Sequence, residues 1–511
     1  MANSSTTQKA LALHRAGDFD AAIGAYRKAL SSEPENAMAW DGLGLALRGQ
    51  GDLAAALKAG EAAVHHGPER AQGWSNRGNT HAAMGDDSSA LADYCQAILL
   101  APGYGEAWAN RGMAEKRLGQ RHDAVASFAR AAELSAANAP ALNHIGNLLF
   151  ELEAFEPAQS CYQKAVAADS DFANGWNNLG NTRIQLLQLE PAITAFEQAL
   201  ACAPGHGEAG NGYAQALLMS GDYRRGWPAY EARFEKPGAP PQKTYDFPRW
   251  SGENLQGKTL YLHAEQGLGD TIQFLRFASK IKQRDARVIL ECPASLHRLA
   301  MTVDGIDQVV TSTQGVTADF HLPLMSVPCL LGLSSDADVA VSGPYITASI
   351  SKTGTHPKTR VGLVWSGNPA HVNDHNRSMA FACLGPLLER VDVEFVSLQT
   401  GPAGAQMQPF DPHRVIADLG RGLADFTDTA AVLADLDLLI TVDTSIAHLA
   451  GAMGRPCWLL LPYVPDWRWR TDGDATPWYP SLRLFRQLER GNWPEVIQRV
   501  GDALQSVNKR S

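Results

Sequence analysis

The sequence lacks several features that mark particular classes of protein. No apolar run approaches the roughly 20 residues that a helix needs to cross a bilayer. The opening segment Met1–Asp18 contains no apolar core, so a Sec-type signal peptide is not expected. Lysine and arginine number 44 against 54 aspartates and glutamates, with no long basic run. This balance argues against a nucleic-acid partner, because phosphate binding depends on clustered cations.

Cysteine is also scarce, with seven residues scattered over 511 and no CxxC pair. Such spacing argues against a disulfide framework and against a zinc site. We therefore expect no metal and no cofactor, and a protein of the cytoplasm. The hydrophobic fraction of 45% favours packed cores over disorder, and the length predicts two or three domains.

An internal repeat fills the first half of the chain. Tryptophans recur in a frame of 34 residues, with Leu142 in one skipped place, and a glycine follows each of these positions four residues later. Alanines and helix-ending prolines keep the same register. The landmarks are Trp40, Trp74, Trp108 and Trp176, then Gly44, Gly78, Gly112, Gly146 and Gly180, then Pro34, Pro68, Pro102 and Pro204. A fixed period of this length predicts a solenoid of stacked units.

Each unit is expected to be a pair of helices. Gly-Asp pairs such as Gly51-Asp52 provide the turn and the cap of the second helix. The pattern resembles the tetratricopeptide repeat, with about seven units over residues 3–236. The last unit departs from it, because Gly210 replaces the tryptophan and Gly226 an alanine. This departure is typical of a terminal unit that docks on something else.

A column of asparagines is predicted on the helix face opposite the tryptophans, at a rotation of about 100° per residue. An amide both donates and accepts, so the column would bind the backbone of a polypeptide. The alternative is that these side chains only solvate the helix or cap neighbouring units. The predicted partner groove comprises Asn76, Asn79, Asn110, Asn147, Asn178 and Asn181.

The second half changes to short apolar runs that alternate with helical stretches, which predicts parallel β/α units. Strands are expected at 259–263, 287–290, 307–310, 360–365, 394–398, 436–442 and 456–461. Helices are expected at 271–282, around 384–391 and 427–434, and at 444–453 and 493–506. We predict two Rossmann-like lobes, at residues 237–350 and 351–511, with a ligand crevice at the carboxyl ends of the strands.

Two loops of the predicted lobes carry chemistry. Asp443, Thr444 and Ser445 lead from an apolar strand into a helix, and His448 lies one turn further on. Free amides, hydroxyls and the helix dipole at this point would bind a diphosphate. The alternative is a simple helix cap with a packed histidine.

The second loop contains Gly267, Gly269 and Asp270. Its two glycines allow close backbone approach, and Asp270 could accept a proton from a hydroxyl. By spacing alone, an N-cap is the more common role for such an aspartate. Ile272 fills the last glycine place of GxGxxG, so a dinucleotide site is weakly indicated.

Three segments together resemble the GT-B glycosyltransferases of the bacterial heptosyltransferase type, glycosyltransferase family 9. They are Gly267–Asp270, Val361–Asn368 and Asp443–Pro456. The blocks Asp466–Trp469, Pro477–Pro480 and Arg483–Gln487 look like those of bacterial proteins that join such a domain to tetratricopeptide repeats. The fold implied is an α-solenoid of tetratricopeptide repeats followed by an α/β GT-B-like domain of two Rossmann-like lobes.

The resemblance also implies roles for individual residues. It makes Asp270 the general base and assigns Asp443, Thr444, Ser445 and His448 to the donor diphosphate. The donor side further includes Gly267, Gly269, Trp365, Gly367, Asn368 and Gln399, the last beside the nucleotide base, and Arg377, which stands where the family often has a lysine. The implied reaction is inverting, metal-independent transfer of a sugar from a nucleotide-diphosphate donor to a hydroxyl.

Several alternatives remain open at this point. The aromatic residues Trp467, Trp469, Trp478 and Tyr479 would either stack on a sugar or base or belong to the core. The Asp435-Leu-Asp437 sequence is interpreted as a chance DxD. The first lobe is short for an acceptor lobe, so either the repeats present a polypeptide acceptor or catalysis has been lost. A non-catalytic repeat scaffold with a degenerate glycosyltransferase domain is therefore the alternative function.

Overall fold

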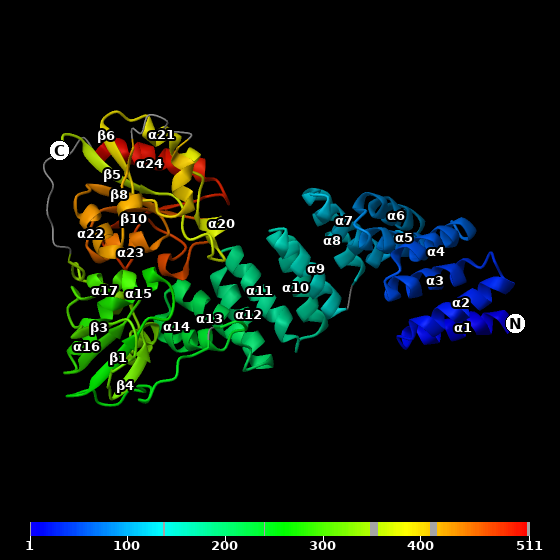
Figure 1. Cartoon of the computed structure of the whole chain (residues 1–511), viewed down its shortest axis with the longest axis horizontal. Coiled ribbons are helices and arrows are strands. Elements are labelled where there is room, and N and C mark those ends of the chain that lie inside the picture. Colours follow the sequence, from blue (N-terminus) through cyan, green and yellow to red (C-terminus); the bar gives the residue numbers. More distant parts are fainter. Residues whose placement is uncertain (1, 136–137, 240, 348–355, 409–415, 508–511) are drawn as a thin grey trace. The chain divides into compact units, whose positions relative to one another are not determined.

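The computed structural model describes residues 2–135, 138–239, 241–347, 356–408 and 416–507 (Figure 1). They divide into two compact units. The first comprises Met1–Leu186 with Glu197–Pro204, and the second comprises Leu187–Phe196 with Gly205–Ser511. In the described ranges, no helix combines the length and apolar character needed to span a bilayer.

Helix pairs make up the repeat region, as the period predicts. Helices of 13 or 14 residues follow one another with short turns. They are α1 (Ala2–Arg15), α2 (Phe19–Ser32), α3 (Ala37–Gln50), α4 (Leu53–His66), α5 (Ala71–Ala83), α6 (Asp87–Leu100), α7 (Gly105–Arg117), α8 (Arg121–Leu134), α9 (Ala139–Glu151), α10 (Phe155–Ala168), α11 (Ala173–Gln185), α12 (Leu189–Cys202), α13 (Gly207–Ser220) and the shorter α14 (Tyr223–Ala229).

The turn between the two helices of a unit is formed by its Gly-Asp pair. Gly51 has φ of +92°, a left-handed conformation that favours glycine. Asp52 then accepts the Ala55 amide at 3.0 Å and so caps α4. Gly17-Asp18 and Gly85-Asp86 repeat the arrangement before α2 and α6. Local sequence therefore determines where each second helix begins.

Tight packing within a unit explains the repeated glycine. An ideal Cβ at Gly112 would lie 2.7 Å from the Phe128 ring, and one at Gly146 would lie 2.6 Å from the Tyr162 ring. The repeated tryptophan stabilises the turn that precedes its helix: Trp40 Nε1 donates a hydrogen bond to the Pro34 carbonyl at 2.7 Å. Glycine is required where an aromatic ring of the second helix lies against the first.

The second unit contains two parallel sheets. The first has the order β3-β2-β1-β4 and the second the order β10-β9-β8-β5-β6-β7. The strands are β1 (Thr259–His263), β2 (Arg287–Glu291), β3 (Gln308–Val310), β4 (Phe320–Pro323), β5 (Thr359–Val364), β6 (Val393–Ser397), β7 (Ala417–Asp418), β8 (Leu438–Val442), β9 (Cys457–Leu461) and β10 (Leu482–Arg486). Every residue of β8 and β9 is buried, as expected for central parallel strands.

Helices connect these strands and cover the sheets. They are α15 (Leu268–Phe274), α16 (Ala278–Lys282), α17 (Ala294–Ala300), α18 (Val327–Leu331), α19 (Asp336–Val339), α20 (Asp374–Arg377), α21 (Gly385–Leu388), α22 (Phe426–Ala434), α23 (Ser445–Ala452) and α24 (Trp493–Val507). The continuous helix predicted over 271–282 is interrupted by a 3₁₀ turn at Leu275–Phe277. Strands β4, β7 and β10 were not among the predicted strands.

Strand order reverses at one point in each sheet. The chain starts at β1 and at β5, builds outward on one side, and returns to the other side with β4 and β8. The second sheet thus has the strand order of the doubly wound nucleotide-binding folds. In such sheets, ligands bind where the order reverses, at the carboxyl ends of the central strands.

The last helix pair packs inside the second unit. Trp227 of α14 is fully buried, stacked on Tyr223 at 5.6 Å between centroids and edge-on to Trp467 at 5.6 Å. An ideal Cβ at Gly226 would lie 2.7 Å from the Leu218 side chain, and one at Gly210 would lie 2.8 Å from Ala232. These close approaches account for the glycines that depart from the repeat pattern.

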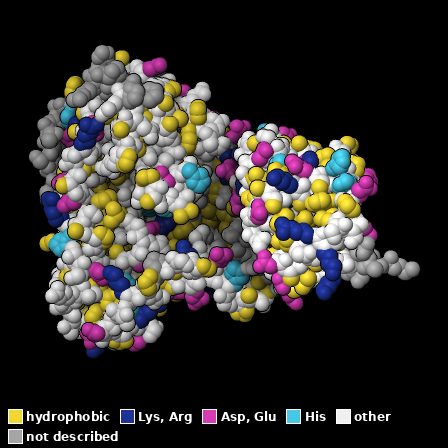
Figure 2. Space-filling model, turned by 45° about the vertical axis from the view of Figure 1, so that its right-hand side comes forward, with side chains coloured by type: hydrophobic (Ala, Val, Ile, Leu, Met, Phe, Trp, Pro, Cys, Tyr) yellow, Lys and Arg dark blue, Asp and Glu magenta, His cyan; other side chains and the backbone are white. Residues whose placement is uncertain are grey.

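Charge is distributed without a dominant sign on the visible surface. Figure 2 shows basic and acidic side chains interspersed, with apolar patches between them. This face therefore presents no large continuous basic area.

Candidate functional site

The segment after β8 lies at the reversal point of the second sheet. Asp443, Thr444 and Ser445 are half-buried and lead directly into α23. Thr444 is the N-cap residue, but its side chain does not cap the helix; its Oγ1 lies 3.2 Å from Thr441 Oγ1. The first amides of a helix have no intrahelical acceptor, so this end remains available to an anion.

The loop after β1 meets this helix end. An ideal Cβ at Gly269 would lie 3.3 Å from Ser445 Cα and 2.8 Å from the His448 ring. A side chain at this position would separate the two segments, so glycine is required here for close approach. The structure thus brings together the two loops that the sequence analysis singled out.

Asp270 is held by two contacts in this corner. Its Oδ2 accepts the Gly267 amide at 2.8 Å, which is the helix-capping contact anticipated as the simpler role. Its Oδ1 accepts a hydrogen bond and ion pair from Arg468. The side chain keeps 19% of its surface exposed.

Arg468 is the organising cation of the corner. It is 6% exposed, pairs with Asp270 and Asp466, and donates from Nε to Gln273 Oε1 at 2.5 Å. Burial opposes its charge, but the two carboxylates outweigh this and raise the pKa of Arg468. Arg468 was not predicted as a site residue, because its partner Asp270 is far away in the chain.

Asp443 lies in a less favourable environment. Burial and the nearby charge of Asp466 raise the pKa of Asp443 to about 6, against the opposing effects of Trp469, Arg377 and Arg468. Such shifted pKa values are common at functional sites.

This shift predicts a pH-dependent stability. The unfolded chain releases the Asp443 proton near its ordinary pKa of 3.8 and the folded chain only near 6. Stability therefore falls as pH rises through this window. We expect Asp443→Asn to stabilise the protein by about 1–3 kcal/mol at pH 7 and by almost nothing at pH 4. Urea unfolding at both pH values measures this, with Asp502→Asn as control, because Asp502 is an exposed residue of α24. An equal gain at both pH values would contradict the assignment.

His448 is packed rather than turned toward the loop. It is 5% exposed, its Nδ1 lies 3.0 Å from the Tyr479 hydroxyl, and its ring faces Trp469 at 5.2 Å. Burial and the charges of Arg468 and Arg276 lower the pKa of His448 well below its ordinary value. The neutral ring supports the alternative interpretation, a packed histidine, over a charged phosphate ligand.

Two residues assigned to the donor are structural. Trp365 is fully buried against Phe381, with 4.7 Å between ring centroids. Gln399 is 4% exposed and accepts the amides of Trp365 and Ser366 at 3.0 and 2.9 Å. Both side chains are buried and hold the loop after β5 from the interior of the lobe. Their placement does not support the predicted contact with a nucleotide.

Asn368 and Arg377, also predicted for the donor side, follow β5 in the chain. Arg377 pairs with Asp374 at 3.2 Å, and its guanidinium lies 2.6 Å from an ideal Cβ at Gly367. Asn368 accepts the Ala370 amide at 3.0 Å and closes a turn. The charge of Arg377 opposes the rise in the pKa of Asp443 in the loop after β8.

The aromatic residues at 467–479 belong to the core. Trp467 is 4% exposed, and Trp469, Trp478 and Tyr479 are fully buried, so they do not stack on a ligand. Of the two interpretations left open for these residues, the structure favours the core.

The Asp435-Leu-Asp437 sequence lies at the amino end of β8. Asp435 contacts Arg360 and His356, and Asp437 accepts the Arg360 amide at 2.8 Å. Within the described ranges, no cluster of three or more histidine, cysteine or acidic residues is arranged to hold a metal ion.

The predicted asparagine column forms a ladder between repeats. Asn79 Oδ1 accepts the Tyr94 hydroxyl at 2.8 Å and the Asn110 amide at 3.0 Å. Asn147 Oδ1 likewise accepts from Tyr162 and Asn178, at 2.8 and 3.1 Å.

The outer members of the column differ in their surroundings. Asn76 is buried and donates to Asp41 at 2.7 Å, while Asn181 is half-buried. Several of these amides therefore form hydrogen bonds between neighbouring repeats. This is the structural role considered for the column, as the alternative to binding a polypeptide.

At the reversal point of the first sheet lies an arginine from the turn that follows the last repeat helix. Glu265 follows β1 and accepts two hydrogen bonds from Arg233, at 3.1 and 2.9 Å. Arg233 belongs to the 3₁₀ turn Tyr230–Phe234 and also donates to Ser326, which follows β4, at 2.7 Å. The turn that follows the last repeat helix therefore contacts the residues just after β1 and β4.

Comparisons with known proteins identify the repeats. A family model described as a tetratricopeptide repeat matches residues 7–71 and 42–110, and another of the same description matches residues 105–138, 139–172 and 173–206. Solved structures with similar helices include the C-terminal part of a TPR repeat-containing protein from Cytophaga hutchinsonii (TM-score 0.38, 14% identity, 45% of this chain and 94% of that chain). Another is Pseudomonas aeruginosa pilF (TM-score 0.34, 18% identity, 41% of this chain and 95% of that chain).

The similarity to one curated protein covers more residues than the repeats alone. Protein FlbA of Caulobacter vibrioides is 28% identical over 326 residues, which are 57% of this chain and 54% of that protein. This chain therefore spans about half the length of that relative. Residues 7–206 are built of tetratricopeptide repeats, a scaffold for protein–protein interaction, and a region of parallel β/α structure follows them.

Proposed function

We propose that the second unit is a GT-B-type glycosyltransferase that transfers a sugar from a nucleotide-diphosphate donor to an acceptor hydroxyl. One observation carries the proposal: the two loops predicted for this chemistry follow β1 and β8, strands at which the order of each sheet reverses, and they touch at Gly269 and Ser445. Nucleotides bind at such reversal points in doubly wound sheets.

The donor side is formed by the loop after β8 and the start of α23. Its uncapped amides and the Thr444 and Ser445 hydroxyls would hold the diphosphate, and Arg377 would add a fixed positive charge. Donors fixed in this way stabilise negative charge as it develops on the leaving group.

The acceptor side faces Asp270. In the proposed step, the acceptor oxygen forms a bond to the anomeric carbon and its proton passes to the Asp270 carboxylate. The bond from the anomeric carbon to the diphosphate oxygen breaks, and its electron pair leaves with the nucleotide diphosphate. Attack opposite the leaving group inverts the anomeric centre. The asparagine column would bind a polypeptide acceptor or partner.

Titration with nucleoside diphosphates tests the donor site. Calorimetry on the full chain with UDP, GDP, ADP, CDP and dTDP is expected to show binding of at least one of them. Arg377→Ala is expected to weaken that binding about tenfold, because a charge-assisted contact to phosphate contributes roughly 1.5–3 kcal/mol. The matched control is Arg421→Ala, which removes an exposed arginine paired with Asp418 in the same lobe.

The alternative is a repeat scaffold with a degenerate glycosyltransferase domain. Its support is that both Asp270 oxygens have partners and that His448 is packed in the interior. If none of the diphosphates binds the wild-type protein, the scaffold is the correct interpretation and the transferase proposal fails.

A further inference from the structure

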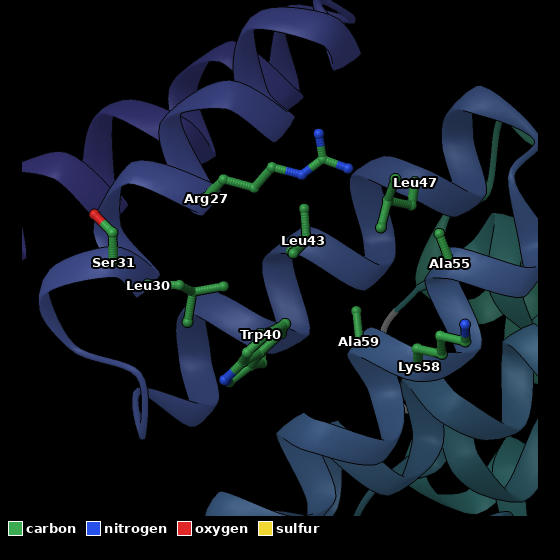
Figure 3. Close-up of a pocket in the computed structure, with 9 residues that line it drawn as sticks. All are labelled: Arg27, Leu30, Ser31, Trp40, Leu43, Leu47, Ala55, Lys58 and Ala59. Atoms are coloured by element: carbon green, nitrogen blue, oxygen red, sulfur yellow. The ribbon is translucent and has the colours of Figure 1, made fainter.

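An open groove lies on the first two repeats, on the helix face opposite the asparagine column. It has a volume of about 480 Å³ and an apolar floor, with Trp40, Leu43 and Leu47 from α3. Figure 3 shows Arg27 of α2 and Lys58 of α4 on opposite sides of this floor. The remaining lining residues are Leu30, Ser31, Ala55 and Ala59, so no acidic side chain lines the groove.

The equivalent place in the next repeats is filled. Arg77 and Asp93, which lie 34 residues after Leu43 and Ala59, form a two-bonded ion pair, and Arg77 covers Trp74 at 4.7 Å. One unit further on, Arg111 covers Trp108 at 5.3 Å and pairs with Glu115 at 2.7 Å. The groove is open at Trp40 because leucine and alanine replace the ion-paired residues there.

The basic rim is also specific to this groove. The residues 34 positions after Arg27 and Lys58 are Glu61 and Ala92, so the repeat pattern does not require two cations. Both cations are exposed, and neither forms an ion pair or hydrogen bond with another described residue. A partner with carboxylates on both sides of an apolar segment would satisfy them.

We propose that this groove binds an acidic amphipathic segment of a partner protein. Apolar side chains of the segment lie on Leu43, Leu47 and the Trp40 ring, and flanking carboxylates pair with Arg27 and Lys58. This site is separate from the asparagine column and does not depend on sugar transfer.

Two labelled peptides test the proposal by fluorescence anisotropy with the full chain. Both carry leucines at i, i+3, i+4 and i+7, flanked by glutamates in one peptide and by lysines in the other. The wild-type protein is expected to prefer the glutamate peptide, with an affinity that falls as salt is added. The double variant Arg27→Glu/Lys58→Glu is expected to reverse this preference by about tenfold or more. Lys164→Glu, an exposed charge change on a distant repeat, is expected to change nothing.

A second variant fills the groove with an ion pair of the kind found in the next repeat. Leu43→Arg/Ala59→Asp copies the Arg77–Asp93 pair, so the helices are expected to form normally, which circular dichroism checks. Binding of the glutamate peptide is expected to be lost. Binding that survives this variant, or a wild-type protein without preference for the glutamate peptide, overturns the proposal. So does a concentration-dependent dimer in sedimentation that this variant abolishes, because the occupant would then be a second copy.

Discussion

Replacing Arg468 by methionine is expected to lower the free energy of unfolding of the second unit by about 3–5 kcal/mol, because one partner of a buried ionic network is removed. Methionine approximates the length of the side chain but leaves Asp270, Asp466 and Gln273 without their shared donor. The cost arises from carboxylates that stay partly buried without a counter-charge.

Urea unfolding followed by tryptophan fluorescence measures this change, since Trp467 and Trp469 are buried on either side of Arg468. Arg298→Met is the control, because Arg298 is 62% exposed and pairs with Asp425 at 3.1 Å. It is expected to change stability by less than about 1 kcal/mol. Similar losses for the two variants would show that Arg468 does not organise the corner.

Replacing Asp270 by asparagine is expected to reduce sugar transfer at least about 100-fold, because the acceptor proton loses its base. Asparagine keeps an oxygen for the Gly267 amide, so the start of α15 is preserved. Nucleoside diphosphate binding is expected to stay within about twofold of wild type, since Asp270 faces the acceptor rather than the diphosphate.

Asp428→Asn is the matched control for this variant. Asp428 also caps a helix, because it accepts the Ala424 amide at 3.0 Å. It lies 3.8 Å from Arg298, so it also has an arginine partner. It has no role in the proposed transfer step. Turnover should be nearly unchanged in it. Full activity in Asp270→Asn, or an equal loss in both variants, would make Asp270 a structural cap only.

Local features of the fold were predictable because neighbouring residues determine them. A glycine with positive φ followed by an aspartate that caps a helix needs no distant partner, so the turns of the repeats follow from sequence. Apolar runs such as 438–442 and 457–461 likewise predicted the buried central strands. The 3₁₀ interruption at Leu275–Phe277 was missed because the apolar pattern of 271–282 continues through it.

The candidate site was predicted in part. Its two loops were identified from glycines, hydroxyls and an aspartate after apolar strands, and the structure places them in contact. The orientation of single side chains was not predictable: Trp365 and Gln399 turn inward, and His448 packs on Tyr479. Whether an aromatic or polar side chain faces a core or a crevice depends on neighbours that are distant in sequence.

The sequence by itself determined the repeat period, the alternation of strands and helices in the second half, and the two segments that end at the crevice. These follow from periodicity and from local backbone preferences. Only the tertiary structure decided that Arg468 holds Asp270, that the terminal repeat places Arg233 on the first sheet, and that the groove at Trp40 is open while its successors are filled. Ion pairs and cavities join residues far apart in the chain, so they exist only once packing has chosen their neighbours.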